Sequence, residues 1–434
     1  MTVPKLRFPE FRDGPAWLAL KFADLYALKR SNTLSRDKLN YETGTIRNIH
    51  YGDIHTRFKP LFRVGNESVP FVNPDAAPSG FADFCDEGDI VLADASEDLD
   101  DVGKAIEVVS LDGERVIAGT HTILATRRGS VPVVGFGGQL FQSAAVRAGI
   151  KKEAQGAKVY GISANRISAI QIPVPPTEAE QQKIADCLGS LDDLIAAEDR
   201  QLKALRQHRR GLSQQLFPDP GEGVPRLRFP IFEGAPRWKK RELRSICERI
   251  MDGTHFSPKS KDGPRPYLTS RNIRQGWLDT TTASCISEEE HREIFARCPV
   301  QQHDVLLTKD GANTGNCAIN SLDYEFSLLS SVAVLRGNVS EVTQQFLFQS
   351  LMSDRHQTMI RNSMSGQAIT RVTLEKLGSY EIALPTIPEQ RHIAECLSSL
   401  DGQIAAQARR IDTLRQHKQG LLQQLFPSLE EVSQ

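Results

Sequence analysis

The sequence predicts an α+β protein made by internal duplication. Two mixed α/β modules are expected at opposite ends of an intramolecular antiparallel coiled coil of two long helices, related by a pseudo-twofold axis. Three observations predict this fold. A heptapeptide near the N-terminus recurs in the middle of the chain, and a longer segment recurs near the C-terminus with 26 of 43 aligned positions identical. The longer segment also has the seven-residue apolar period of paired helices.

The heptapeptide opens each module. Residues 3–9 read Val-Pro-Lys-Leu-Arg-Phe-Pro and recur at 224–230 with a single Lys-to-Arg change. Trp17 matches Trp238 at the same spacing. Two stretches of the chain therefore begin in the same way, as expected for copies of one fold.

Between the repeats the modules agree only in short islands. Arg47-Asn48-Ile49 matches Arg271-Asn272-Ile273, and residues 140–143 match 347–350. A plain structural duplication would diverge at a similar rate throughout. The uneven divergence instead favours a common scaffold that carries two different binding surfaces.

Short β-rich runs predict strands inside both modules. They lie at 89–92, 131–134 and 304–307 and are separated by glycine, proline and asparagine turns. Together with the helical segments, they indicate modules of mixed α/β character.

The long repeat at 176–218 and 385–427 predicts the two helices. Each copy opens with a capping box, at Thr177 and Thr386, and each ends before a Phe-Pro pair, where proline prevents continuation. Apolar residues recur at alternating steps of four and three, which predicts a heptad seam. The seam consists of Ile184, Leu188, Leu191, Ile195, Leu202, Leu205, Leu212, Leu216, Ile393, Leu397, Leu400, Ile404, Ile411, Leu414, Leu421 and Leu425.

Polar residues interrupt the seam in the same register in both copies, at Glu198 and Arg209 and at Gln407 and Lys418. A helix of about 40 residues is roughly 60 Å long, too long to bury its seam against one small domain. The two seams are therefore expected to pair antiparallel within one chain, because intramolecular pairing costs less entropy. Pairing between two chains in a homodimer is the alternative.

These features divide the chain into two modules, two helices and their connections. The predicted parts are a first module at 1–175, a helix at 176–218, a linker at 219–223, a second module at 224–384, a second helix at 385–427 and a tail at 428–434.

The overall charge is nearly balanced, with 53 basic and 54 acidic residues and a net charge of -1. Such a balance is not typical of a nucleic-acid-binding domain. Local charge is uneven, however, because residues 83–101 are acid-rich while 206–210 and 237–244 are basic and suited to face phosphates. The seven cysteines contain no C-x-x-C pair, so reduced thiols are expected. No apolar run approaches the roughly 20 residues of a membrane span, and we expect a cytoplasmic protein without a membrane partner.

No catalytic motif appears. Gly103-Lys104 lacks the remaining residues of a phosphate loop, and the Gly-Phe-Gly-Gly run at 135–138 is expected to be a turn and not a nucleotide cradle. Asn73-Pro74-Asp75 departs at its third position from the Asn-Pro-Pro-aromatic motif of amino-methyltransferases. The sequence therefore predicts a protein that is not an enzyme and that has no metal site.

Polar side chains suited to base edges or phosphates gather in the predicted loops. Arginine pairs with guanine, and asparagine or glutamine pairs with adenine, through two hydrogen bonds. The recurring Arg-Asn pairs stand out, although their islands could equally be kept for folding. The candidate DNA-binding residues are Arg47, Asn48, His50, Tyr51, Lys151, Lys152, Gln155, Lys158, Lys259, Lys261, Arg265, Arg271, Asn272, Arg274, Lys309, Asn313, Gln367 and Arg371.

The chain resembles the specificity subunits of type I restriction-modification enzymes over nearly its whole length. One part of the resemblance is the Gly-Leu-x-Gln-Gln-Leu-Phe-Pro ending that begins at Gly211 and again at Gly420. The other is the opening of the second helix and its near-copy after Pro176. The residues of that opening are Pro385, Glu389, Gln390, Ile393, Ala394 and Leu397.

The resemblance implies that the modules are target-recognition domains and that each reads one part of a split, asymmetric sequence in double-stranded DNA. It implies no cofactor in this chain. Two methyltransferase subunits would supply adenine methylation with S-adenosylmethionine, and up to two restriction or translocase subunits would use ATP and Mg. Two alternatives remain: the recognition subunit of a related type IIB-like system, or a coiled-coil scaffold with two protein-binding modules and no role with DNA.

Overall fold

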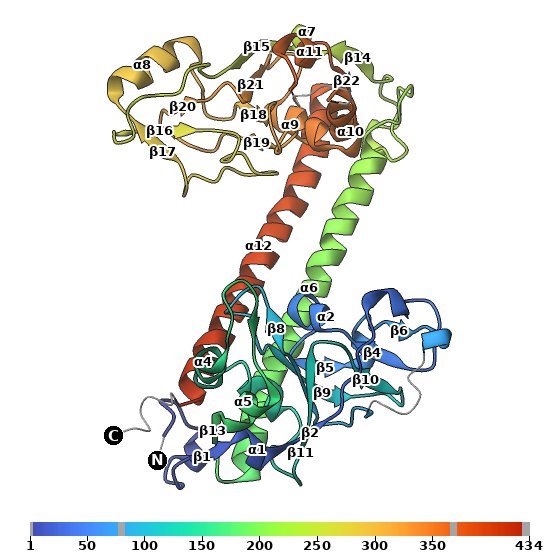
Figure 1. Ribbon diagram of the computed structural model, residues 1–434. Helices are drawn as coiled ribbons and strands as arrows, with labels where there is room; N and C mark the ends of the chain where they lie inside the picture. Colours follow the sequence, from blue (N-terminus) through green and yellow to red (C-terminus); the bar gives the residue numbers. More distant parts are fainter. Residues whose placement is uncertain (1–2, 77–82, 365–370, 428–434) are drawn as a thin grey trace. The chain divides into compact units, whose positions relative to one another are not determined.

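The computed structural model describes residues 3–76, 83–364 and 371–427, which form a mixed α/β protein with two long helices (Figure 1). The predicted mixed class is confirmed. The long helices are α6 (Glu178–Leu216) and α12 (Ile387–Leu425), and both end directly before the Phe-Pro pairs.

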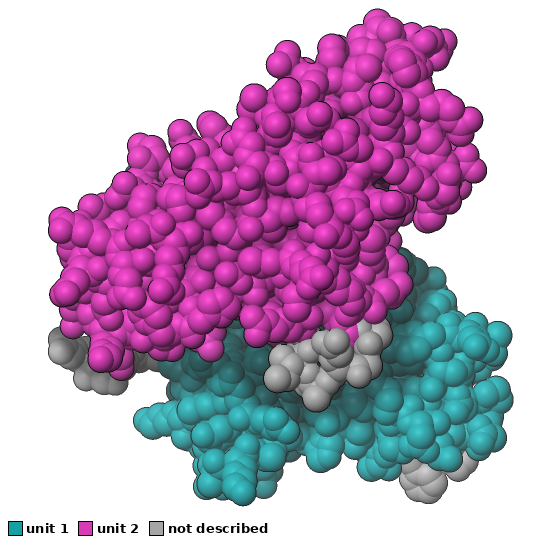
Figure 2. Space-filling view, turned by 90° about the horizontal axis from the view of Figure 1, so that it is seen from above, with its two compact units in different colours: residues 1–199, 409–434 teal, residues 200–408 magenta. Residues whose placement is uncertain are grey.

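The chain divides into two compact units, which Figure 2 draws in different colours. Unit 1 comprises Met1–Asp199 and Arg409–Gln434, and unit 2 comprises Arg200–Ala408. Both boundaries fall inside the long helices. Each unit therefore contains one globular module together with part of α6 and part of α12.

Within each unit the two long helices run antiparallel. In unit 1, Asp192 pairs with Lys418 at 2.7 Å and Asp199 pairs with Arg415 at 3.0 Å, so the α12 partner falls in number as the α6 residue rises. In unit 2, the end of α6 and the start of α12 share one apolar cluster. The predicted intramolecular antiparallel pairing is confirmed.

Every side chain predicted for the seam is buried or half-buried. The ends of the seam pack into the modules as well as between the helices, because Ile184, Leu188 and Leu425 belong to the apolar core of unit 1. The polar interruptions Glu198 and Lys418 are also buried. Besides pairing the helices within each unit, the seam therefore packs its ends into the modules.

The centre of unit 1 is a five-stranded sheet in the order β2-β11-β7-β9-β5, and a four-stranded sheet in the order β10-β4-β6-β3 lies in the same unit. Two-stranded sheets pair β1 with β13 and β8 with β12. The elements are β1 (Leu18–Lys21), α1 (Phe22–Leu25), β2 (Tyr26–Lys29), β3 (Leu39–Asn40), β4 (Arg47–Ile49), α2 (Tyr51–Thr56), β5 (Leu61–Arg63), β6 (Phe71–Val72), β7 (Ile90–Ala93), β8 (Ala95–Ser96), β9 (Ala105–Ser110), β10 (Val116–Ala118), β11 (Thr122–Arg127), α3 (Phe136–Leu140), α4 (Ala144–Glu153), β12 (Tyr160–Gly161), α5 (Ala164–Ala169) and β13 (Gln171–Val174).

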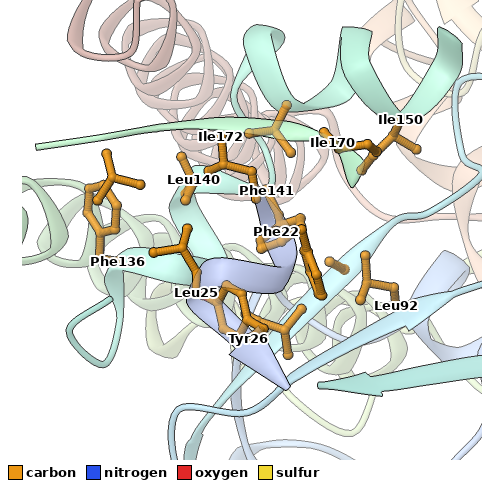
Figure 3. Close-up of a cluster of buried hydrophobic side chains, with 14 of the residues drawn as sticks. Phe22, Leu25, Tyr26, Leu92, Phe136, Leu140, Phe141, Ile150, Ile170 and Ile172 are labelled. Carbon is orange, nitrogen blue, oxygen red and sulfur yellow. The ribbon is translucent and has the colours of Figure 1, made fainter. Parts of the chain in front are cut away.

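The central sheet of unit 1 is buried on both faces. Successive side chains of a strand point to opposite faces. Leu92 of β7 accordingly lies in the cluster with Phe22 and Phe141 that Figure 3 shows, whereas its neighbours Val91 and Ala93 belong to a second apolar cluster. Apolar layers on both faces explain why this strand is an uninterrupted apolar run.

Unit 2 repeats this plan with a four-stranded central sheet in the order β15-β21-β18-β19. A three-stranded sheet, β17-β16-β20, and the pair β14-β22 complete it. The elements are β14 (Lys239–Glu242), α7 (Leu243–Ile246), β15 (Cys247–Asp252), β16 (Arg265–Leu268), β17 (Ser284–Ile286), α8 (Glu288–Arg297), β18 (Val305–Thr308), β19 (Cys317–Ile319), β20 (Ser327–Leu328), β21 (Val332–Gly337), α9 (Gln344–Met352), α10 (Asp354–Ser363), α11 (Leu374–Gly378) and β22 (Glu381–Leu384).

Two of the three predicted β-rich runs are strands, because β7 and β18 cover 89–92 and 304–307 apart from their first residues. The prediction for 131–134 is wrong. This segment is a loop with a cis Val131–Pro132 peptide bond, and it leads into α3. The backbone amide of Val133 donates to the Gln181 side chain, so it is satisfied without a neighbouring strand.

The repeated heptapeptide forms a buried joint between module and helix. In unit 1, Arg7 donates to both carboxylate oxygens of Glu180 at 2.7 Å, and the indole of Trp17 donates to the same carboxylate at 3.1 Å. The Arg7 guanidinium also donates to the carbonyls of Gly14 and Pro15. Glu180 lies in the first turn of α6, so these bonds fix the direction of the helix relative to the module.

Unit 2 contains the same joint. Arg228 donates to both oxygens of Glu389 at 2.8 and 2.7 Å, and Trp238 donates to Glu389 at 3.2 Å. The joint explains why arginine, tryptophan and glutamate recur while most of the module does not.

The joint also corrects the predicted capping boxes. The Thr177 hydroxyl accepts from the amide of Glu180, as expected, but the Glu180 carboxylate is held by Arg7 and Trp17 and does not return to the start of the helix. Glu389 is held in the same way. A buried bidentate arginine is a stronger partner for a carboxylate than a single backbone amide.

The Phe-Pro ending of each helix completes a core. Phe426, directly after α12, packs in unit 1 with its ring centroid 5.9 Å from Trp17 and 5.7 Å from Phe136. Phe217, directly after α6, packs in unit 2 at 6.4 Å from Trp238. Each module therefore needs one helix that starts from it and one that ends in it.

We predict that Glu180→Gln destabilises unit 1 by about 3–5 kcal/mol, because it leaves the buried Arg7 charge without a counter-charge. Urea unfolding of the full chain measures this loss. Glu178→Gln is the matched control: Glu178 is exposed in the same turn, and we expect a change below about 0.5 kcal/mol. Equal losses in the two variants would contradict a special role for the joint.

We also predict that His356 makes the free energy of unfolding sensitive to acid. His356 is buried, and its Nε2 lies 3.1 Å from the carbonyl oxygen of Glu381. Burial lowers the pKa of His356 to about 4. Because the unfolded histidine takes up its proton near pH 6.5, stability falls as the pH drops from 6.5 to 4, by up to about 3 kcal/mol.

Urea unfolding at several pH values tests this. His356→Gln should flatten the acid loss, whereas His208→Gln, an exposed control on α6, should keep it. The same acid slope in the wild type and in His356→Gln would count against the assignment.

Candidate nucleic-acid interface

The two recurring asparagines are buried. Asn48 is completely buried, and its amide donates to the Asn32 side chain at 3.2 Å. Asn272 is also buried; its amide donates to the Asp279 carbonyl and its oxygen accepts from the Thr269 amide, both at 2.9 Å. Neither side chain is open to a base edge in this conformation. For these two asparagines, burial favours the alternative that they are kept for folding.

Three candidate arginines are engaged in local pairs. Arg47 packs over the Phe71 ring at 4.1 Å and pairs with Glu114 at 3.0 Å. Arg274 is bound to the carboxylate of Asp279 at 3.1 Å. Arg265 likewise pairs with a glutamate of α8. These pairs tie loops to strands, which is sufficient reason for the arginines to be present.

The remaining candidates differ in exposure. His50 is buried at the start of α2, where its Nδ1 accepts from the Gly52 amide, and burial lowers its pKa. Lys309 is buried, and Gln367 lies outside the described residues. Half-buried candidates are Tyr51, Lys151 and Asn313, and exposed candidates are Lys152, Gln155, Lys158, Lys259, Lys261, Arg271 and Arg371.

One edge of the central sheet gathers several candidates in unit 1. The Tyr51 ring lies 4.7 Å from the His50 ring and 5.3 Å from the ring of His121, which directly precedes β11. His121 Nδ1 lies 3.3 Å from Asp94, which follows β7. His121 has a φ of 53°, which is uncommon for a residue with a side chain and marks a locally constrained backbone.

A short hairpin adjoins this edge. The backbone of Gln155 pairs with that of Gly161, and β12 pairs with β8, which begins directly after Asp94. The turn between Gln155 and Gly161 carries the exposed Lys158. Tyr51 is therefore brought to the same edge as Gln155 and Lys158, although it is far from them in the sequence.

The corresponding edge of unit 2 contains a chain of charges. The buried ammonium of Lys309 lies 3.2 Å from Asp252 and 3.3 Å from Asp310. Asp310 in turn lies 3.5 Å from the guanidinium of Arg371, and Asp252 lies 3.5 Å from His255. Sequence reasoning found the two cations and missed the two aspartates, because no periodic or spacing signal links the ends of separate strands.

The glycine run at 135–138 is more than the expected turn. Gly135 has a φ of 92° and begins α3, and the amides of Gly135 and Gly138 donate to the buried Glu107 carboxylate at 2.8 and 2.6 Å. Burial raises the pKa of Glu107 to about 7. An internal carboxylate thus occupies the amides that a phosphate would need.

Metal and membrane features were assessed over the described ranges. Within residues 3–76, 83–364 and 371–427, no three histidine, cysteine, aspartate or glutamate side chains are grouped so that they could hold a metal ion. In the same part of the chain, no helix combines the length and the apolar character needed to cross a bilayer.

The family model described as "Type I restriction modification DNA specificity domain" matches residues 140–207 and 236–416, more than half of the chain. The chain belongs to this family. The matched ranges contain most of both long helices and most of the second module. The family resemblance inferred from the repeats is therefore confirmed.

Relatives support the assignment. The type I restriction enzyme MjaVIII specificity subunit of Methanocaldococcus jannaschii is 23% identical over 284 residues, which cover 64% of this chain and 66% of that protein. The match thus spans slightly less than two thirds of the relative's length.

Two solved structures share the fold. The type I restriction-modification S subunit from M. genitalium superposes with a TM-score of 0.62 over 99% of this chain and 100% of that chain, at 16% identity. A chain from a structure concerning complex assembly and conformational transition of the type I R-M system gives a TM-score of 0.54 at 16% identity, over 95% of this chain and 98% of that one.

We predict that Asn272→Ala lowers the free energy of unfolding by about 1–3 kcal/mol, because it leaves the Thr269 amide and the Asp279 carbonyl without their partner. Arg271→Gln, at the exposed neighbouring position, should change it by less than about 0.5 kcal/mol. Urea unfolding of both full-length variants measures the difference. A neutral Asn272→Ala would return this residue to the base-reading candidates.

Proposed function

We propose that the chain is the DNA-reading specificity subunit of a type I restriction-modification complex and is not itself catalytic. It would bind two different half-sites of one asymmetric target and direct adenine methylation and restriction by partner subunits. The observation that supports this most strongly is the contrast within the duplication. The buried joints of helix and module are the same in both units, whereas the outer parts of the modules differ.

The identical parts suit a partner present in two copies. Surfaces that bind two copies of one protein must be alike, which fits two methyltransferase subunits that use S-adenosylmethionine. Restriction subunits that use ATP and Mg would join the same assembly. Partner subunits would also share the phosphate contacts that dominate DNA affinity, which makes the balanced charge of this chain acceptable.

Each unit contains a polar cluster in which one basic residue of a long helix binds an aspartate of the other helix and a glutamine of the module. We call these two clusters the polar nodes, and they support a fixed spacing between the half-sites. In unit 2, Arg209 of α6 binds Asp401 of α12 at 3.0 Å and Gln349 of the module at 2.6 Å. Each node joins both helices to one module. Because a polar contact in an apolar seam is satisfied in a single register, the nodes would hold the helices in place as a ruler.

In unit 1 the node consists of Lys418 of α12, which binds Asp192 of α6 at 2.7 Å, and Gln142 of the module at 3.4 Å. Arg209 and Lys418 are aligned in the repeat, as are Asp401 and Asp192. Each unit would therefore contain an equivalent node that fixes the register of the two helices.

We predict that inserting seven residues after Ala204 in α6 and after Ala405 in α12 widens the gap between the half-sites by about 3 base pairs. One heptad adds roughly 10 Å of helix, and DNA rises about 3.4 Å per base pair. Both insertions lie between the two nodes, so the nodes keep their partners. The two half-site sequences should stay unchanged.

Methylome sequencing of cells that express the chain with its methyltransferase partners measures this. An insertion in α6 alone is the control: it puts the two seams out of register between the nodes and should reduce methylation. An unchanged gap after the double insertion would contradict the proposal that the two helices set the spacing of the half-sites. If the wild-type chain directed no methylation, or methylation without a bipartite target, the proposed function would be wrong.

A further inference from the structure

The two units share one backbone pattern at the edge of the central sheet. In unit 1, the amide of Asp94 donates to the carbonyl of His121 at 3.0 Å, and the carbonyl of Asp94 accepts from the amide of Ile162 at 2.8 Å. Asp94 directly follows β7, and Ile162 directly follows β12. These two bonds place Asp94 where the central strand leaves the sheet.

Unit 2 has the same two bonds. The amide of Lys309 donates to the carbonyl of Ser331 at 2.8 Å, and the carbonyl of Lys309 accepts from the amide of Val372 at 2.9 Å. Lys309 directly follows β18, the equivalent of β7. Asp94 and Lys309 therefore occupy one backbone position, and the strands before them align without a gap as Asp89-Ile-Val-Leu and Asp304-Val-Leu-Leu.

At this shared position the two units have opposite charges. The neighbouring positions differ too: His121 of unit 1 stands where unit 2 has Ser331. The next residue along the chain is Ala95 in unit 1 and Asp310 in unit 2. At the joints, by contrast, arginine, glutamate and tryptophan are the same in both units. A surface that must recognise two different sequences has to differ in this way.

The charged side chains at the unit 2 edge hold one another in place. Lys309 is only 1% exposed, yet its ammonium is shared between Asp252 and Asp310. Arg371, whose side chain is 47% exposed, ends this chain of charges beside Asp310. Burying a lysine ammonium is costly unless it is paired with a carboxylate. Lys309 therefore needs Asp310 beside it, and Asp310 in turn holds Arg371.

The unit 1 edge also presents one exposed side chain that its neighbours hold in place. The His121 side chain is 57% exposed, while Asp94 contacts it on one side and the Tyr51 ring on another. Buried polar atoms without hydrogen-bond partners occur at both edges: Nδ1 of His55 in α2, whose Nε2 bonds to Ala95, and Oγ1 of Thr308 at the end of β18. Such atoms are uncommon in folded proteins.

We propose that this edge, which we call the variable edge (Asp94 and His121 in unit 1; Lys309, Asp310 and Arg371 in unit 2), contacts base edges of the DNA half-sites. His121 is the base-contacting residue of unit 1 and Arg371 that of unit 2. Lys309 and the aspartates are positioning residues. This inference rests on the proposed DNA-recognition function.

The neighbouring carboxylates distinguish base contacts from phosphate contacts. Asp310 beside Arg371 and Asp94 beside His121 would repel a phosphate. A carboxylate is compatible with a base edge, because it can accept from an exocyclic amine while the arginine donates to O6 and N7 of guanine. The variable edge of unit 2 is therefore suited to a half-site that contains guanine.

The test uses the full chain purified with its methyltransferase partners. The target is first identified by methylome sequencing with the wild-type chain, and methylation rates are then measured on duplexes in which each half-site base is replaced in turn. The variants are Arg371→Gln and His121→Gln. Arg249→Gln is the matched control, because Arg249 is exposed on β15, away from the Asp252 end of that strand.

We expect Arg371→Gln to reduce discrimination at one base of one half-site by about 5- to 150-fold, the fold-change that corresponds to a bidentate base contact. His121→Gln should relax one base of the other half-site, and Arg249→Gln should change neither. Arg371→Lys, which keeps the charge but not the planar fork, should behave like Arg371→Gln.

Two results would overturn the inference. Unchanged base preference in both variants would show that the variable edge does not face bases. An equal fall in rate on every duplex would show a phosphate contact. In either case the wild type and Arg249→Gln would still direct methylation, so the proposed function would stand. A wild-type chain that directs no methylation would instead remove the proposed function, and this inference with it.

Discussion

The architecture depends on a buried ion pair that occurs twice, Arg7 with Glu180 and Arg228 with Glu389. Each pair links the first residues of a unit to the first turn of a long helix, and the adjacent tryptophan indole shares the carboxylate. Removing two charges from water is costly, and only the bidentate geometry and the extra hydrogen bonds offset that cost. Those requirements allow one orientation of helix and module, which is why the residues of the joint recur when the rest of the module does not.

The same constraint makes both units discontinuous. A helix that starts from one joint carries a Phe-Pro ending that fills the core of the other unit, so neither module completes its core from its own segment alone. The heptad seam therefore has two functions: it pairs the helices within each unit, and its ends belong to the module cores. Polar nodes at Arg209 and Lys418 interrupt the seam where each module meets both helices. An apolar seam alone tolerates sliding, whereas a node of this kind is satisfied in only one register.

The contrast between joint and variable edge connects the fold with the function. Both lie on elements that the two units share, but at the joint the side chains are the same and at the edge they differ in charge and in kind. The buried contacts of the joint restrict side chains because every partner must fit, while the strand ends at the variable edge keep the same two backbone bonds with an aspartate in one unit and a lysine in the other. The duplication can thus preserve one scaffold and present two chemically different edges, which the proposed recognition of an asymmetric target would require.

The sequence by itself determined the duplication, the two long helices with their seam, the mixed class and the family, because these follow from periodicity and repetition along the chain. It did not determine which residues form the proposed recognition surface. Asn48 and Asn272 recur and have base-reading chemistry, yet the folded chain buries them in loop hydrogen bonds. Asp94 and His121 give no local signal and meet only because β7 and β11 are neighbours in the sheet. Strand pairing between distant segments decides such contacts, and only the tertiary structure contains that information.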